Sequence, residues 1–206
     1  MSYAVKEIYY TLQGEGANTG RPAVFLRFAG CNLWSGREQD RSTAICQFCD
    51  TDFVGGTKYA GAEQVAEEVA SQWFGNGTSK RFVVITGGEP LLQVDRPLID
   101  SLHNLGFEIA IETNGTIAAP DGIDWICVSP KAGTVIKQRT GDELKLVYPQ
   151  QGITPKELER LDFERFFLQP MDGPDVERNT ELAARYCLEH PRWRLSLQTH
   201  KLLGIR

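Results

Sequence analysis

Hydrophobic positions along the chain repeat with two different periods. Short apolar runs predict β-strands, and apolar residues three to four positions apart predict helices. The expected strands are residues 23–28, 81–85, 107–111, 124–128, 144–148, 166–168 and 193–197, and the expected helices are residues 62–74, 97–105, 155–161 and 180–189. Apolar strands separated by helices or crossovers indicate an α/β fold with a largely parallel sheet.

The number of elements restricts the architecture. A complete eight-unit βα barrel needs about 250 residues, whereas this chain has 206 residues and few expected helices. We therefore expect a partial, open and abbreviated βα barrel of about six mostly parallel strands, built as a single domain over residues 1–206.

Polar residues follow the end of nearly every expected strand. They include Thr86, Gly87, Gly88 and Glu89 after the second strand, Glu112 and Asn114 after the third, Ser129 and Lys131 after the fourth, Gln169 after the sixth, and Gln198 and His200 after the last. The carboxyl ends of parallel strands form the active-site rim of βα folds, so these residues should converge on one mouth. Each one alone can be an ordinary polar loop residue.

Composition and charge disfavour several classes of protein. The formal net charge is -5 and there is no basic run, which argues against a nucleic-acid partner. No signal peptide and no apolar run of membrane-spanning length is visible, so we expect a cytoplasmic protein with no membrane partner. In that reducing compartment, the five cysteines are metal ligands, a nucleophile or core thiols rather than disulfides. Cys127 and Cys187 are most simply buried core thiols.

The other three cysteines lie in one long, strand-poor loop, at about residues 29–57. Fourteen residues separate Cys31 from Cys46, and two separate Cys46 from Cys49. A four-iron cluster needs four ligands, so three thiolates would leave one iron open to a small molecule. A thioredoxin-like redox pair at Cys46 and Cys49, or a zinc site with a histidine as fourth ligand, are the alternatives.

Several further motifs carry a resemblance to a known family. They are Leu12-Gln13-Gly14-Glu15-Gly16, Phe25-Leu26-Arg27-Phe28, Gly30-Cys31-Asn32-Leu33, Cys49-Asp50-Thr51, Thr86-Gly87-Gly88-Glu89-Pro90, Glu112-Thr113-Asn114-Gly115, Ser129-Pro130-Lys131 and Gln169-Pro170. Together they resemble the radical S-adenosylmethionine (SAM) superfamily, although its usual first cysteine spacing is shorter. Within that superfamily the chain resembles the 7-carboxy-7-deazaguanine synthases, which have an expanded cysteine loop, over essentially its whole length.

The resemblance implies an activity and its cofactors. It implies a radical SAM lyase of queuosine and 7-deazapurine biosynthesis that converts 6-carboxy-5,6,7,8-tetrahydropterin to 7-carboxy-7-deazaguanine and releases ammonia. The implied cofactors are a [4Fe-4S] cluster on the three cysteines, SAM and Mg²⁺, with the radical chemistry borne by a 5′-deoxyadenosyl radical rather than by a catalytic side chain. A homodimer and a flavodoxin as electron donor are also implied.

The same resemblance implies which residues bind these molecules. Thr51 is the implied Mg²⁺ ligand, which suits a hard cation that needs few protein oxygens; alternatively, Thr51 and Asp50 only cap the cysteine loop. The residues expected to bind SAM are Phe48, Gly87, Gly88, Glu89, Glu112, Asn114, Ser129, Lys131 and Gln169. The residues expected to bind the substrate are Leu12, Gln13, Gly14, Glu15, Arg27, Thr86 and His200. Glu112 and Asn114 are equally compatible with contacts to the substrate.

Two other functions remain open at this point. One is a different radical SAM enzyme, such as a glycyl-radical activase, which would not need the polar set formed by Gln13, Glu15, Arg27 and His200. The other is a non-catalytic module in which the cysteines hold zinc.

Overall fold

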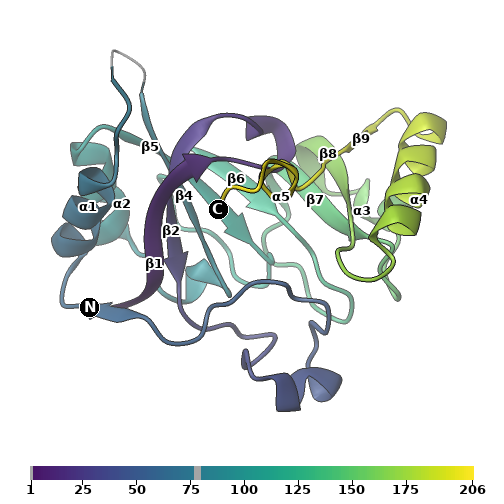
Figure 1. Ribbon diagram of the computed structural model, residues 1–206, viewed down its shortest axis with the longest axis horizontal. Helices are drawn as coiled ribbons and strands as arrows, with labels where there is room; N and C mark the ends of the chain where they lie inside the picture. Colours follow the sequence, from purple (N-terminus) through teal and green to yellow (C-terminus); the bar gives the residue numbers. More distant parts are fainter. Residues whose placement is uncertain (1, 77–79) are drawn as a thin grey trace.

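The computed structural model describes residues 2–76 and 80–206 as an α/β fold built on one nine-stranded sheet (Figure 1). In order across the sheet, the strands are β3 (Thr57–Tyr59), β1 (Tyr3–Leu12), β2 (Pro22–Phe28), β4 (Arg81–Gly87), β5 (Phe107–Thr113), β6 (Trp125–Val128), β7 (Thr140–Tyr148), β8 (Asp162–Pro170) and β9 (Trp193–Leu195). Neighbours from β2 to β9 pair in parallel, whereas β1 is antiparallel to both β2 and β3. Because β3 and β9 do not pair with each other, the sheet is open.

Helices cover one face of this sheet at both ends. They are α1 (Ala62–Ser71), α2 (Arg96–Asn104), α3 (Pro155–Leu158) and α4 (Val176–Glu189). The short α5 (Thr199–Leu203) lies instead beside the loop that follows β1, and 3₁₀ helices lie at Gly16–Asn18, Glu38–Thr43 and Pro90–Leu92. One apolar cluster joins α1 and α2 to β1, β2, β4 and β5, and another joins α3 and α4 to β7 and β8, as the two helix pairs in Figure 1 suggest. Within the described part of the chain, none of the helices has the length and apolar character needed to cross a membrane.

The opposite face of the sheet becomes polar towards the carboxyl ends of its strands. Successive side chains on a strand point to opposite faces: on β7, Leu144 and Leu146 join the helix-side core, and Lys145 points to the other face. Near the amino ends that other face is apolar, with Ala23, Phe82, Val84 and Ala110 packed together. Polar groups therefore gather at one end, where a site can form.

The predicted α/β class and the open, mostly parallel sheet are confirmed, but the sheet has nine strands rather than about six. The sequence pattern missed β1 because a β-bulge between Val5 and Glu7 shifts its phase. Tyr3 and Val5 before the bulge, and Ile8 and Tyr10 after it, pack on the same core. Strand β3 was missed because it is a three-residue edge strand.

Several predicted boundaries are also corrected. The expected strands at residues 144–148 and 166–168 each begin four residues earlier, because β7 and β8 pair as far back as Thr140 and Asp162. The amino end of β7 is polar, and that of β8 has Phe163 as its one apolar residue, so backbone pairing extends both strands without an apolar run. Helix α4 begins at Val176 rather than at residue 180, α1 ends at Ser71 and α3 ends at Leu158.

Candidate functional site

A cavity lies at the carboxyl ends of the parallel strands. Cys31, Cys46 and Cys49 all lie in its wall, together with Phe48. The strand ends contribute Thr86, Gly87, Gly88, Glu112, Asn114, Ser129, Lys131, Gln169 and Gln198. The predicted convergence of the strand ends on one mouth is therefore confirmed for these residues, whereas Glu89 and His200 do not line this cavity.

The sulfur atoms of the three cysteines lie in the same cavity wall, but they do not form one tight group. A hydrogen bond with Cys46 lowers the pKa of Cys49 to about 6, and the same bond raises the pKa of Cys46, while burial raises the pKa of Cys31. Among the described residues, the three sulfurs do not form a group whose members all lie within 4.8 Å of one another. The three thiols share one wall of the cavity, where they can converge on a metal centre.

Glycines at the end of β4 allow it to approach the first cysteine. A Cβ on Gly88 would lie against the carbonyl oxygen of Gly30 and 2.6 Å from Cβ of Cys31. At Gly87 the backbone has a φ of 150° and passes against the backbone of Phe28. The two glycines therefore set the position of Cys31, besides leaving the cavity wall free of side chains.

Glu89 lies behind the cavity wall. Its carboxylate is fully buried and accepts hydrogen bonds from Leu91 N, Thr113 Oγ1 and Asn114 N, at 3.0, 2.8 and 2.8 Å. Burial raises the pKa of Glu89 against the effect of these donors. The structure shows Glu89 joining the ends of β4 and β5, and its role in binding SAM stays a prediction.

Lys131 brings a positive charge to the cysteine side of the cavity. Its Nζ donates to Ser129 O and Oγ at 2.6 and 2.7 Å and lies 5.9 Å from the centre of the Phe48 ring. Burial lowers the pKa of Lys131, although the charges of Cys46 and Cys49 act in the opposite direction.

A second cavity adjoins the first. All seven residues predicted to bind the substrate line it: Leu12, Gln13, Gly14, Glu15, Arg27, Thr86 and His200. Its volume of about 500 Å³ is in the range of small-molecule sites. The wall shared by the two cavities consists of Glu15, Asp50, Thr51, Thr86, Glu112 and Gln198. A molecule in one cavity would therefore lie beside a molecule in the other, with Thr51 between them.

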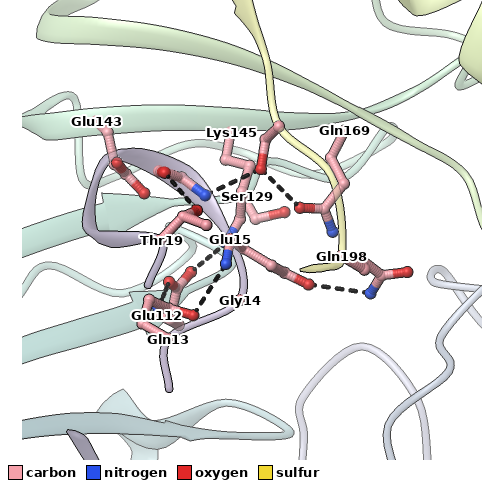
Figure 2. A network of polar contacts seen from close by, with 12 residues as sticks. Gln13, Gly14, Glu15, Thr19, Glu112, Ser129, Glu143, Lys145, Gln169 and Gln198 are labelled. Carbon is pink, nitrogen blue, oxygen red and sulfur yellow. Dashed lines mark hydrogen bonds and ion pairs between the residues drawn. The ribbon is translucent and has the colours of Figure 1, made fainter. Parts of the chain in front are cut away.

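Lys145 is a residue of this site that the sequence reasoning missed. Its buried ammonium group forms ion pairs with Glu15 and Glu112 on the shared wall (Figure 2). The signal was present as charged residues at positions 143 and 145, alternating with Leu144 and Leu146. Two charged side chains on the buried face of a parallel strand are expected only where they form ion pairs or take part in binding or catalysis.

One acidic group near Lys145 has the spacing of a metal site. Ligand atoms of Glu112, Cys127 and Glu143, on the adjacent strands β5, β6 and β7, lie within 4.8 Å of one another. Ala17 N already donates to Glu143 at 2.9 Å, and Lys145 pairs with Glu112. We therefore interpret the group as part of a buried charge network. The predicted burial of Cys127 is confirmed, although its thiol faces carboxylates.

The C-terminal segment forms another wall of the second cavity. His200 packs against Gly14, where an added Cβ would clash with the imidazole ring. Lys201 Nζ lies 2.7 Å from Asp50 and 2.6 Å from Asp172, so it ties α5 to the cysteine loop and to the end of β8. Sequence reasoning gave Asp50 only as part of the Cys49-Asp50-Thr51 motif, with no role in the site, and did not find Asp172.

Comparison with known proteins identifies the family. A scan against protein-family models finds no match. The chain is 65% identical to the 7-carboxy-7-deazaguanine synthase of Bradyrhizobium diazoefficiens and 62% identical to that of Caulobacter vibrioides, and each alignment covers 100% of both chains. The chain belongs to the 7-carboxy-7-deazaguanine synthase family. This confirms the resemblance seen in the motifs and identifies the protein as an enzyme.

A solved structure supports the same assignment for the fold. The crystal structure of QueE from Escherichia coli matches with a TM-score of 0.70 and 28% sequence identity, over 96% of this chain and 94% of that chain. The 7-carboxy-7-deazaguanine synthase fold of this chain is thus an open, mostly parallel βα arrangement with its two cavities at the carboxyl ends of the strands.

Proposed function

We propose that this enzyme is a radical SAM lyase that converts 6-carboxy-5,6,7,8-tetrahydropterin to 7-carboxy-7-deazaguanine and ammonia. The observation that carries the proposal is the pair of adjoining cavities, one lined by the three cysteines and the other by the seven predicted substrate residues. A radical made in one cavity must meet the substrate without meeting water, and a shared wall provides that proximity.

The three cysteines would hold the [4Fe-4S] cluster. Thiolates are the ligands that such clusters prefer, and Cys49 reaches the thiolate state readily because its pKa is about 6. With the cluster and SAM bound, the cofactors supply the 5′-deoxyadenosyl radical that takes a hydrogen atom from the substrate. Lys131, close to Cys46 and Cys49, would offset the negative charge of the thiolates.

The other residues of the first cavity would bind SAM. Gly87 and Gly88 present bare backbone to the cavity, while Ser129 and Gln169 offer hydrogen-bonding groups to the ribose and the carboxylate of SAM. Phe48 offers its backbone to the adenine. Glu112 and Asn114 also line this cavity, and the second cavity includes Glu112 but not Asn114.

The residues of the second cavity would bind the pterin. Glu7 and Tyr9 hold Arg27 through its Nε and one terminal nitrogen. The other terminal nitrogen has no hydrogen-bond partner among the described residues and could meet the substrate carboxylate. Gln13, Glu15, Thr86 and His200 provide donors and acceptors for the ring. Thr51 on the shared wall would bind Mg²⁺ with substrate oxygens.

We further propose that the whole chain acts as one domain, as a homodimer in the cytoplasm, with a flavodoxin as electron donor. These points rest on the resemblance to the family and on the need of the cluster for an electron.

The first test is the metal and sulfide content of protein purified without oxygen. We expect about four irons and four sulfides per chain. Alanine at Cys31, Cys46 or Cys49 should remove most of them, whereas Cys187→Ala on α4 should leave the content unchanged. The wild type should also form 7-carboxy-7-deazaguanine from the pterin with SAM, Mg²⁺ and a reductant.

Two results would contradict the proposal. A colourless wild type with one tightly bound zinc would support the zinc-binding module instead. A normal cluster without a new deazapurine in the chromatogram would support a different radical SAM enzyme.

A further inference from the structure

Lys145 lies where the two cavities meet, and no predicted role uses it. Its side chain is 4% exposed, and Nζ lies 2.7 Å from Glu15 Oε2 and 2.9 Å from Glu112 Oε2. Figure 2 shows one ammonium group joining the two carboxylates. Because Glu15 and Glu112 both line the second cavity, Lys145 fixes two acceptors on the wall that the pterin would face.

The remaining oxygens of the two carboxylates are also held. Gln198 Nε2 donates to Glu15 Oε1 at 2.9 Å, and Gln13 Nε2 donates to Glu112 Oε1 at 3.2 Å. A carboxylate oxygen can accept two hydrogen bonds. The Cys127 thiol also bonds to Glu112. Both Glu15 oxygens and one Glu112 oxygen therefore keep capacity for an N–H donor of a bound ligand, in a direction set by the protein.

The charge of Lys145 controls the protonation of this wall. Burial alone would raise the pKa of Glu15, but the charge of Lys145 and hydrogen bonds from Lys145 and Gln198 bring that pKa below its ordinary value. Without Lys145, burial would dominate, and Glu15 would carry a proton and donate where it now accepts. The other titratable and charged groups that face these three side chains are Asp50, Cys127, Lys131, Glu143, His200 and Lys201.

We propose that Lys145 is a positioning residue that determines specificity for the pterin ring, by keeping Glu15 and Glu112 as a fixed pair of hydrogen-bond acceptors. A pterin presents adjacent donors, the ring N3–H and the 2-amino group, and carboxylates bind such donors more strongly than neutral acceptors do. This inference rests on the proposed function, because it requires the pterin to occupy the second cavity.

The test is the affinity of the cluster-loaded protein for 6-carboxytetrahydropterin, measured by anaerobic calorimetry with SAM and Mg²⁺ but without a reductant. Binding is then measured without turnover. Lys145→Met should bind about 100-fold more weakly at neutral pH, as expected when hydrogen bonds to charged groups are lost. Affinity should recover towards about pH 9, where a buried glutamate with a raised pKa ionises.

Two further variants complete the test. Lys145→Arg keeps the charge and should retain most of the affinity, and Lys156→Met on the exposed surface of α3 should match the wild type at every pH. If Lys145→Met does not fold, the triple variant with Glu15→Gln and Glu112→Gln removes the unpaired carboxylates. It should bind weakly without alkaline recovery, because its amides do not titrate.

Several results would overturn the inference. Lys145→Met could bind like the wild type at neutral pH, or equally weakly from about pH 6 to pH 9, which would indicate a purely structural role. Alkaline recovery in the triple variant would contradict it as well. A wild type that does not bind the pterin would overturn the proposed function together with the inference. If the wild type binds the pterin, the variants test the role of Lys145 alone.

Discussion

At the scale of single residues, the contact between Gly88 and Cys31 couples the sheet to the cysteine loop. Gly88 follows the last residue of β4, and its Cα lies too close to Gly30 and Cys31 to carry a side chain. The nearby hydrogen bond from Glu89 N to Gly30 O, 3.0 Å long, fixes the same approach. The position of the first cysteine thus depends on the absence of a single methyl group.

Gly88→Ala is therefore expected to displace Cys31. The added methyl group should destabilise the fold by about 1–3 kcal/mol, as overpacking does, and should lower the iron content of the purified protein. Chemical denaturation and an iron assay measure the two effects. Gly61→Ala is the matched control, because no atom of the described residues lies within 4 Å of the position of its Cβ. Equal iron content in both variants would contradict this explanation.

Residue patterns predicted the side chains that lie in motifs and missed those that act through pairing. The cysteines, glycines and polar strand ends could be found because they lie in short motifs or directly after apolar strands. Lys145 and Asp50 could not be assigned, because their partners Glu15 and Lys201 are more than a hundred positions away. Only the folded chain shows which charges meet.

At the scale of elements, the fourteen residues between Cys31 and Cys46 are organised by Arg41. This residue lies in the 3₁₀ helix Glu38–Thr43, and its guanidinium group lies 4.1 Å from the centre of the Trp34 ring. Its NH1 donates to the carbonyl oxygens of Gln47 and Cys49 at 3.0 and 3.1 Å. The insertion therefore holds the backbone on which Cys46 and Cys49 are carried.

Arg41→Met should weaken cluster retention more than it weakens the fold. The loop would lose two hydrogen bonds from a charged donor, each of which contributes about 1.5–3 kcal/mol when buried and less at this half-exposed position. We expect iron to be lost faster in the presence of a chelator, which the decay of visible absorbance measures. The melting temperature should be nearly unchanged. Arg185→Met, on the exposed side of α4, is the control. Iron loss at the same rate in both would refute this role for Arg41.

Periodicity predicted the elements that are regular and buried on one side. All seven strands of the parallel part of the sheet were found, because their helix-facing side chains are apolar. The bulge in β1 broke the period of that strand, and the 3₁₀ helix around Arg41 is too short and too polar to give a pattern. Both are held by tertiary contacts.

At the scale of the whole molecule, the C-terminal segment joins parts that are distant in the sequence. Lys201 binds Asp50 and Asp172, Thr199 N donates to Gly14 O at 3.0 Å, and Thr11 Oγ1 donates to Arg206 O at 2.7 Å. Figure 1 shows α5 close to the loop that follows β1. The segment thus closes the second cavity against the N-terminal strand.

Lys201→Met should loosen this closure without unfolding the protein. Partly exposed ion pairs contribute about 0–1 kcal/mol each, so global stability should change little. Hydrogen exchange of the amides at residues 199–206 should become faster, and binding of the pterin should weaken several-fold. Lys58→Met on the edge strand β3 provides an exposed control. Unchanged exchange at residues 199–206 would show that Lys201 does not secure the segment.

The strand order also has a consequence for how the protein is made. Apart from β3, the strands lie across the sheet in the order in which they are synthesised, so each new strand can join an existing edge as it leaves the ribosome. Two segments instead return to the side of the sheet that is synthesised first. They are the cysteine loop, which leads into β3, and the last residues of the chain. The second cavity is therefore the last part of the site to be completed during translation, because one of its walls is the end of the chain at residues 198–206.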